Sequence, residues 1–352
     1  MNEGSPVTLK PTLPFLLEQT DPDWKIYQDD PLPPWGSGNF TLFNSPKGDL
    51  TKDERCHTAI YSIPFDSTSS TRVGSRKGPL AIRQASQAYS SQQKSRSVDQ
   101  LYNIRTDQMV MVNPPIMVDF GDLHIYPSDP KKQTTAIYAE VNRIMMLSER
   151  VVMLGGEHTV SIGNFYGVAS RFQTEKGKRL GYVQIDHHFD FGDQSKLHGN
   201  LYHGCNGRRI AEHPELEPSS CGFVGQGDLT SAKQFKYLLE MGFNIRTIPN
   251  IRKEGFEKSL RQVLDQVSQV CDELYISIDI DVCENATAPG TGHVTVGGIN
   301  STEFMSMASI LHDYPVVALD LVEVSPDYDP GGATASLAAR FLFEWIFLHK
   351  IH

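Results

Sequence analysis

Short apolar runs recur along the chain from residue 57 onward and alternate with longer segments in which apolar residues follow a helical period. The runs that we assign to strands cover residues 58–65, 115–122, 150–156, 180–188, 221–226, 273–281 and 315–324. Several runs are almost continuously apolar, which is typical of strands buried on both faces of a parallel sheet. Between them, residues 133–149 and 334–348 repeat apolar side chains on one helical face. This alternation predicts one doubly wound α/β domain with helices on both faces of the sheet.

The N-terminal residues differ from this pattern. They are rich in Pro, Gly and Asp, but they also contain Trp24, Trp35, Phe40 and Phe43. A freely mobile tail gains nothing from such large apolar side chains. We therefore divide the chain into an N-terminal extension at residues 1–55, packed on the domain itself or on a neighbouring subunit, and a main domain at residues 56–352.

Composition narrows the kinds of partner. The 352 residues include 42 acidic and 32 basic side chains, a formal net charge of −10, and no Lys/Arg cluster offers the basic surface that nucleic-acid phosphates require. This charge instead favours a cationic ligand. No apolar run approaches the ~18 residues of a membrane span, and five cysteines without a CxxC pair fit a reducing compartment. We expect a cytoplasmic protein that binds neither nucleic acid nor membrane.

Polar residues gather where four of the predicted strands end. Because the carboxyl ends of parallel strands meet at one edge of the sheet, we expect these residues to lie together. Buried carboxylates are costly unless a cation pairs with them. Aspartates together with histidines suit two divalent ions of the Mn, Ni or Zn type, since Mg²⁺ and Ca²⁺ prefer all-oxygen sites and a structural zinc site would use thiolates. The residues are His158, Asp186, His188, Asp190, Asp279, Asp281 and Glu323.

Two of these strand ends place polar residues at every second position. Aspartate, histidine and aspartate alternate over residues 186–190, and two aspartates do so over residues 279–281. In an extended backbone, alternate side chains point to the same side. We therefore expect one side of each segment to face a shared pair of ions.

These segments resemble a known family. GGEHT (155–159), IDHHFD (185–190), SIDIDVCENATAPGTG (277–292) and EVSPDYDPGGATASLAARFL (323–342) are similar to the metal-site motifs of the ureohydrolases, which include arginase and agmatinase. IPFDSTSSTRVGSRKGPLAIR (63–83) and DFGD (119–122) extend the match, which covers roughly residues 57 to 348 and is closest to the agmatinase-like branch. The resemblance implies a three-layer α/β/α fold with a mainly parallel eight-stranded sheet.

The resemblance also implies a role for each site residue. Asp186 and Asp279 would bridge two divalent ions, either Mn²⁺ or Ni²⁺. The other four ligands would complete the two shells, His158 and Asp190 at one ion, and His188 and Asp281 at the other. A hydroxide between the ions would attack the carbon of a small cationic guanidino substrate and release urea, or a urea-like product, and an amine.

Two more residues receive catalytic roles from the resemblance. Glu323 would pair with the guanidinium nitrogens. His198, in LHGNLYHG, would carry a proton to the leaving amine. The family also leads us to expect a trimer or hexamer, built as a homo- or hetero-oligomer.

The chain departs from the family pattern near the site. Val282 to Asn285 replace Gly-Leu-Asp-Pro, His293 and Val294 replace Thr-Pro, Glu157 replaces Asp, His187 replaces Ala and His203 replaces Arg. We interpret these changes as a rebuilt pocket, with His293, His203 and Asn285 as substrate-binding residues. A short or tailless substrate, such as guanidine or a biguanide, fits them as well, and the resemblance then favours nickel.

Three alternatives carry distinct sequence signatures. Formimidoylglutamate hydrolysis fits poorly with EVSP and the His-Gly pair. A deacetylase-like amide hydrolase would need a single-metal pattern with tandem histidines, whereas both Asp-x-Asp and Asp-x-His-x-Asp are intact. A weakly active or non-catalytic subunit of a hetero-oligomer would be expected to have lost ligands, and all six are present; this alternative stays open if loops occlude the pocket.

Overall fold

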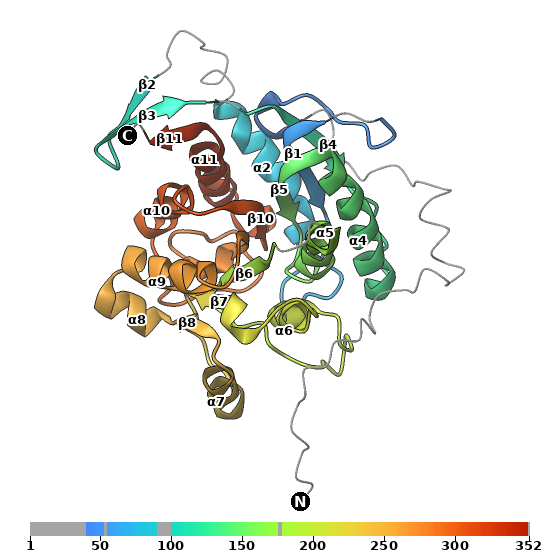
Figure 1. Ribbon diagram of the computed structural model, residues 1–352, viewed down its shortest axis with the longest axis vertical. Helices are drawn as coiled ribbons and strands as arrows, with labels where there is room; N and C mark the ends of the chain where they lie inside the picture. The colour runs from blue at the N-terminus through green and yellow to red at the C-terminus, as the bar shows by residue number, and fades with distance from the viewer. Residues whose placement is uncertain (1–39, 53–54, 90–99, 114, 175–177, 351–352) are drawn as a thin grey trace, which may run out of the picture.

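The seven predicted strands and one unpredicted strand, β8, form one eight-stranded sheet in the computed structural model, which describes residues 40–52, 55–89, 100–113, 115–174 and 178–350 (Figure 1). The strand order is β4-β1-β5-β10-β9-β6-β7-β8, and every neighbouring pair is parallel. This confirms the predicted α/β fold. The strands are β1 (Cys56–Ile63), β4 (Met117–Asp122), β5 (Ser148–Gly155), β6 (Leu180–Ile185), β7 (Cys221–Val224), β8 (Asn244–Arg246), β9 (Glu273–Asp279) and β10 (Val316–Val322).

Helices cover both faces of this sheet, as Figure 1 shows. One face packs against α4 (Pro130–Leu147), α5 (Val160–Thr174) and α6 (Asn206–Ala211), and the other against α2 (Gly78–Ser86), α9 (Phe256–Ser268), α10 (Ser301–Leu311) and α11 (Ala333–Phe347). Helices α7 (Ala232–Met241) and α8 (Ile248–Glu254) flank β8 in the chain. None of the described helices is both long and apolar enough to cross a membrane.

The two helix layers explain why the strands are apolar almost throughout. In β1, Ala59 and Tyr61 face the core under α4 and α5, whereas Ile60 between them faces the core under α2 and α11. All three side chains are fully buried. A strand covered on both faces has no position at which a polar side chain would reach water, so the alternation of a half-exposed strand is lost.

Short strands could not be predicted from the pattern of apolar residues. A second sheet, β11 (Leu348–Lys350), β3 (Gln108–Val112) and β2 (Gln100–Asn103), is antiparallel and was not predicted. Its strands have three to five residues, and β2 is partly exposed. The predicted helix 334–348 ends at Phe347, because the chain continues directly into β11. Such short, half-exposed strands do not generate a recognisable run.

The described part of the N-terminal extension, residues 40–52, packs on the domain. Phe43 is fully buried, and its ring contacts Phe343 and Phe347 of α11 with centroids 5.9 and 5.3 Å apart. Gly48 donates a backbone hydrogen bond to Asp119 of β4. Trp24 and Trp35 lie outside the described residues.

A buried ion-pair network anchors the β1–β4 edge of the sheet. Arg83 of α2 is fully buried and donates two hydrogen bonds to Asp119, at 2.9 and 2.7 Å, and one to Asp122 at 3.1 Å. Asp119 also accepts from the backbone N–H of Leu42 at 2.8 Å. Two of the family motifs, DFGD and the segment that ends at Arg83, therefore meet in one structural contact.

We predict that Arg83→Met lowers the free energy of unfolding by about 3–5 kcal/mol, because it leaves two buried carboxylates without a cation. Urea denaturation followed by circular dichroism at pH 7 measures this change. Arg143→Met is the matched control, since Arg143 is exposed on α4 and its loss should change stability by at most about 0.5 kcal/mol. Equal denaturation midpoints for the two variants would contradict the role given to Arg83.

Candidate metal centre

The candidate site lies at the carboxyl ends of five strands that are neighbours in the sheet, β5, β10, β9, β6 and β7. In sheet order these ends carry His158, Glu323, the pair Asp279 and Asp281, the series Asp186, His188 and Asp190, and finally Asp228. Residues separated by more than 150 positions in the chain thus meet because their strands are adjacent. The parallel topology places every one of these strand ends on the same edge of the sheet.

Two groups of side chains converge there. In the first, the Nδ1 atom of His158 lies 3.2 Å from Asp186, 3.1 Å from Asp190 and 3.3 Å from Asp279. In the second, the Nδ1 atom of His188 lies 3.5 Å from Asp186 and 3.2 Å from Asp281. Asp186 belongs to both groups. The structure therefore brings together all six residues that the sequence predicts as ligands.

The backbone reaches this arrangement differently from the sequence prediction. Strand β6 ends at Ile185, and residues 186–188 bend, with the His188 N–H donating to Asp186 at 2.6 Å. Asp190 adopts a left-handed backbone with φ 43°. Asp281 lies in a 3-10 turn, where its N–H donates to Asp279 at 2.8 Å. The prediction that residues 186–190 and 279–281 are extended was wrong. Side chains that converge on one ion site need a curved backbone.

A glycine permits the close approach of three chain segments behind His158. A Cβ atom on Gly156 would lie 1.9 Å from the carbonyl oxygen of Phe65. The Gly156 carbonyl accepts from Glu323 at 2.8 Å, and its N–H donates to Ile63 at 2.8 Å. The glycine of the GGEHT motif thus joins β1, β5 and β10 directly below the site.

A buried hydrogen-bond chain fixes the orientation of His158. Its Nε2 atom lies 2.9 Å from Ser277 Oγ, which donates to Asp320 at 2.6 Å. Since the Ser277 hydroxyl proton goes to Asp320, Ser277 accepts the Nε2 proton, so Nδ1 is the ring nitrogen of His158 that is left to bind a cation. Nδ1 is buried and has no hydrogen-bond partner among the described residues. A buried ring nitrogen that faces three carboxylates fits a cation held between them.

The pKa shifts of the aspartates also fit a bound cation. Burial raises the pKa of Asp279 well above its ordinary value, and the charges of Asp281 and Asp186 raise it further. Burial likewise raises the pKa of Asp190 and of Asp281. For Asp186, burial opposes ionisation, but contacts with His158 and His188 lower its pKa below the usual range. Bound cations would keep all four carboxylates ionised.

Glu323 lies beside the first group. It has a left-handed backbone with φ 64°, and its carboxylate accepts from the His158 N–H at 3.0 Å. His203 places Nδ1 3.7 Å from this carboxylate. On its other side, the His203 ring contacts Ser70, whose hydroxyl lies 2.7 Å from Nε2. Backbone strain at both Asp190 and Glu323 coincides with the site, as is common where side chains are held for function.

Glu157 supports the loop that carries Ser70. It is fully buried, and burial together with the charge of Glu323 raises its pKa to about 7. The backbone N–H of Thr68 donates to it at 3.0 Å, and the hydroxyl of Ser69 donates at 2.8 Å. The substitution of Glu for Asp at this position thus lengthens a side chain that holds the neighbouring loop.

Three other predicted residues differ in how close they come to the centre. His198 is half-buried in the turn 195–199 and makes no hydrogen bond or ion pair within the described part of the chain. Asn285 is exposed, and its backbone N–H donates to Thr295. His293 is partly exposed and packs against His188, with ring centroids 4.5 Å apart. The structure therefore brings His203 and His293 to the site, and does not bring the side chains of His198 or Asn285 into contact with it.

Several residues of the site were not predicted. Ser277 and Asp320 orient His158, Gln184 donates to Asp186 at 2.7 Å, and Asp228 lies 3.4 Å from His188. A signal exists for three of them, since Gln184, Ser277 and Asp320 are polar residues inside apolar strand runs and are fully buried. A polar residue within a buried strand requires a partner.

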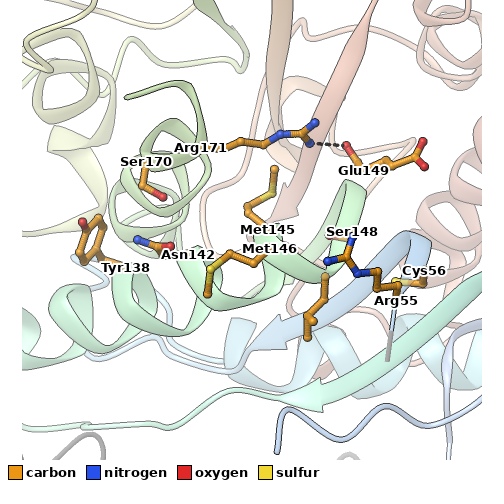
Figure 2. A pocket seen from close by; sticks show the side chains of 11 residues that line it. Arg55, Cys56, Tyr138, Asn142, Met145, Met146, Ser148, Glu149, Ser170 and Arg171 are labelled. Carbon is orange, nitrogen blue, oxygen red and sulfur yellow. Dashed lines mark hydrogen bonds between the residues drawn. The ribbon is translucent and has the colours of Figure 1, made fainter. Parts of the chain in front are cut away.

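The structure has a cavity beside the candidate site and a larger one at the opposite edge of the sheet. A cavity of about 170 Å³ lies beside the centre and is lined by His188, Asp190, Asp228 and Gln234. A larger one, about 600 Å³, lies at the starts of β1 and β5, next to Cys56 and Ser148 (Figure 2). Because it is at the amino-terminal edge of the strands, the larger cavity contains none of the predicted site residues.

Comparison with known proteins agrees with this geometry. The sequence matches the Arginase family model over residues 56–348. It is 28% identical over 305 residues to guanidinopropionase of Pseudomonas aeruginosa, covering 85% of this chain and 88% of that protein. It is 29% identical over 302 residues to mitochondrial agmatinase of Gallus gallus, covering 84% and 82%.

A solved structure is also similar. Proclavaminate amidino hydrolase of Streptomyces clavuligerus superposes with a TM-score of 0.72 at 25% identity, covering 90% of this chain and 98% of that chain. The chain therefore belongs to the arginase family and is a metal-dependent ureohydrolase of its agmatinase-like branch.

Proposed function

We propose that this protein is a binuclear-metal hydrolase that cleaves a carbon–nitrogen bond of a small cationic guanidino compound, releasing urea or a urea-like product and an amine. The observation that carries the proposal is the convergence of three carboxylates on His158 Nδ1, at 3.1–3.3 Å. The second group around His188 shares Asp186 with the first. Similarity to a guanidinopropionase and an agmatinase supports the substrate class.

Six residues would hold the ions. His158 and Asp190 would bind one, His188 and Asp281 the other, and Asp186 and Asp279 would bridge them. Carboxylates and imidazoles without thiolates suit both Mn²⁺ and Ni²⁺. Two such ions, when bound, would activate a water molecule near neutral pH and polarise the group under attack.

Glu323 would bind the substrate's guanidinium. Its carboxylate is held by the His158 N–H and by the turn after β10, so little ordering is needed when a cation arrives. Four aspartates balance two divalent ions, which leaves the charge of Glu323 for one guanidinium. A charged hydrogen bond of this kind is worth about 1.5–3 kcal/mol.

The remaining histidines and Asn285 complete the proposal. His198 would transfer a proton to the leaving amine. His203, His293 and Asn285 would contact the rest of the substrate. We also propose that the active form is a homo- or hetero-oligomer, a trimer or a hexamer.

We predict that the metal-loaded protein releases urea from at least one compound in a panel of agmatine, guanidinobutyrate, guanidinopropionate, arginine, guanidine and biguanide. A colorimetric urea assay measures the product. Activity should disappear after chelation with EDTA and return with Mn²⁺ or Ni²⁺, because the ions would activate the attacking water. Turnover that persists in the metal-free protein would contradict the proposal.

We predict close to two transition-metal ions per chain, and loss of both in Asp186→Ala, because Asp186 lies in both groups of side chains. Elemental analysis after dialysis measures the content. Asp313→Ala is the matched control, since Asp313 precedes β10 at the opposite edge of the sheet. One tightly held ion that survives Asp186→Ala would rule out a binuclear centre.

We predict that Glu323→Gln lowers kcat/KM by roughly 10- to 100-fold, the equivalent of one charged hydrogen bond. The metal content should not change, because Glu323 lies outside both ligand groups. Steady-state kinetics with the preferred substrate, together with elemental analysis, separates these effects. Unchanged kcat/KM would place guanidinium recognition elsewhere.

A further inference from the structure

The loop after β7 contributes a residue to the centre that no sequence motif marks. Asp228 lies on this loop, and its Oδ2 atom is 3.4 Å from Nε2 of His188. That nitrogen is buried and has no hydrogen-bond partner among the described residues. The opposite ring nitrogen, Nδ1, faces Asp281 and Asp186. One imidazole therefore joins the candidate ion site on one side to an exposed carboxylate on the other.

We propose that Asp228 is a positioning residue, which accepts the Nε2 proton of His188 and so presents the Nδ1 lone pair of His188 to the ion held with Asp281. The inference rests on the proposed function, because it assigns Nδ1 to an ion. An outer carboxylate that accepts from a ligating histidine fixes its tautomer and ring orientation, and its loss commonly weakens metal binding 10- to 100-fold.

The carboxylate of Asp228 is oriented for this contact. Its Oδ1 atom accepts from the Leu229 N–H at 2.6 Å, which leaves Oδ2 directed at the two imidazoles of His188 and His293, at 3.4 and 3.9 Å. A separation of 3.4 Å is longer than an ordinary N–H···O bond. Hydrogen bonds at active sites often shorten when the ligand is bound.

The backbone on either side of Asp228 is tied to the strand end that carries His188. Gly227 donates to the carbonyl of His187 at 3.0 Å, and the Gln226 side chain donates to the carbonyl of Asp186 at 3.1 Å. A Cβ atom on Gly227 would lie 2.3 Å from Cε1 of the His187 ring. The bulky His187, where the family has Ala, is therefore accommodated by a glycine, and this packing sets the position of Asp228.

His293 supports the same imidazole from a third direction. Its ring packs edge to face on His188, at an interplanar angle of 65°. It comes from the loop after β9, whereas Asp228 comes from the loop after β7. The two residues confine the exposed side of His188 between them.

Titration of the metal-free protein with Mn²⁺, followed by isothermal calorimetry at constant pH, tests the proposal. In Asp228→Ala, binding of one of the two ions should weaken 10- to 100-fold, while the other ion keeps its affinity because the His158 group is untouched. Asp228→Asn, which retains an acceptor oxygen, should lie between Asp228→Ala and the wild type. Asp313→Ala should bind as the wild type does.

Other outcomes would overturn the inference. Equal weakening of both ions would mean that the loop merely supports the fold. Unchanged metal affinity with a raised KM would make Asp228 a substrate contact, and a third Mn²⁺ ion lost in Asp228→Ala would make it a ligand. Gly227→Ala, which displaces the loop from His187, should reproduce the selective loss.

Failure of the proposed function gives a different result. A wild-type protein that binds fewer than two ions would contradict the binuclear centre itself, whatever Asp228 does. Two ions bound equally well by the wild type and by Asp228→Ala would leave the proposed function intact and remove only the positioning role.

Discussion

The mutual repulsion of four aspartates, three of them buried and Asp190 largely so, is the constraint on which the rest of this structure depends. Their strands are central in the sheet, so water screens the charges poorly, and burial is the largest cause that raises the pKa of three of them. Among the described residues, the side chains that face the aspartates are imidazoles rather than Lys or Arg. The Nε2 side of His158 is held by Ser277, so its Nδ1 atom is the one that faces the carboxylates. Bound divalent cations would offset the charge of all four aspartates, which is why we interpret the site as a metal centre rather than as a buried salt bridge.

The packing of the sheet, the close contact at Gly156 and the turns after the strands together position the aspartates. Apolar packing on both faces fixes the strands, and the glycine at position 156 lets three of them approach closely. Turns then redirect the chain, at the cost of left-handed backbones at Asp190 and Glu323. A left-handed conformation at a non-glycine residue persists only where its surroundings over-determine it. The Glu323 N–H donates to the carbonyl of Gly156 after β5, and the Asp190 carbonyl accepts from the Arg208 N–H of α6, so neighbouring elements hold both turns in place.

Much of this arrangement could be predicted from the sequence, and the part that could not has physical reasons. The long buried strands were predictable because burial on both faces leaves an uninterrupted apolar run, whereas β8, with three residues, leaves almost none. The ligand types were predictable because several charged residues end buried strands. Their backbone was not, since an alternating pattern is equally compatible with an extended strand and with a bend. Asp228 was missed because a single aspartate on a loop has no signature of its own. Ser277 carries a signal, as a polar residue within a buried strand, but the sequence does not show which imidazole it contacts.

The departures from the family pattern are physically coupled, which changes how they should be interpreted. His187 requires the space left by Gly227, and the resulting loop carries Asp228 to His188. His293 then covers the same imidazole, while Glu157 holds the loop whose Ser70 contacts His203. Changing one of these residues alone would therefore disturb a neighbour rather than tune an isolated contact. A pocket altered in this way differs from its relatives in the support of its ligands as well as in its lining, so substrate preference and metal affinity should not be expected to vary independently in this protein.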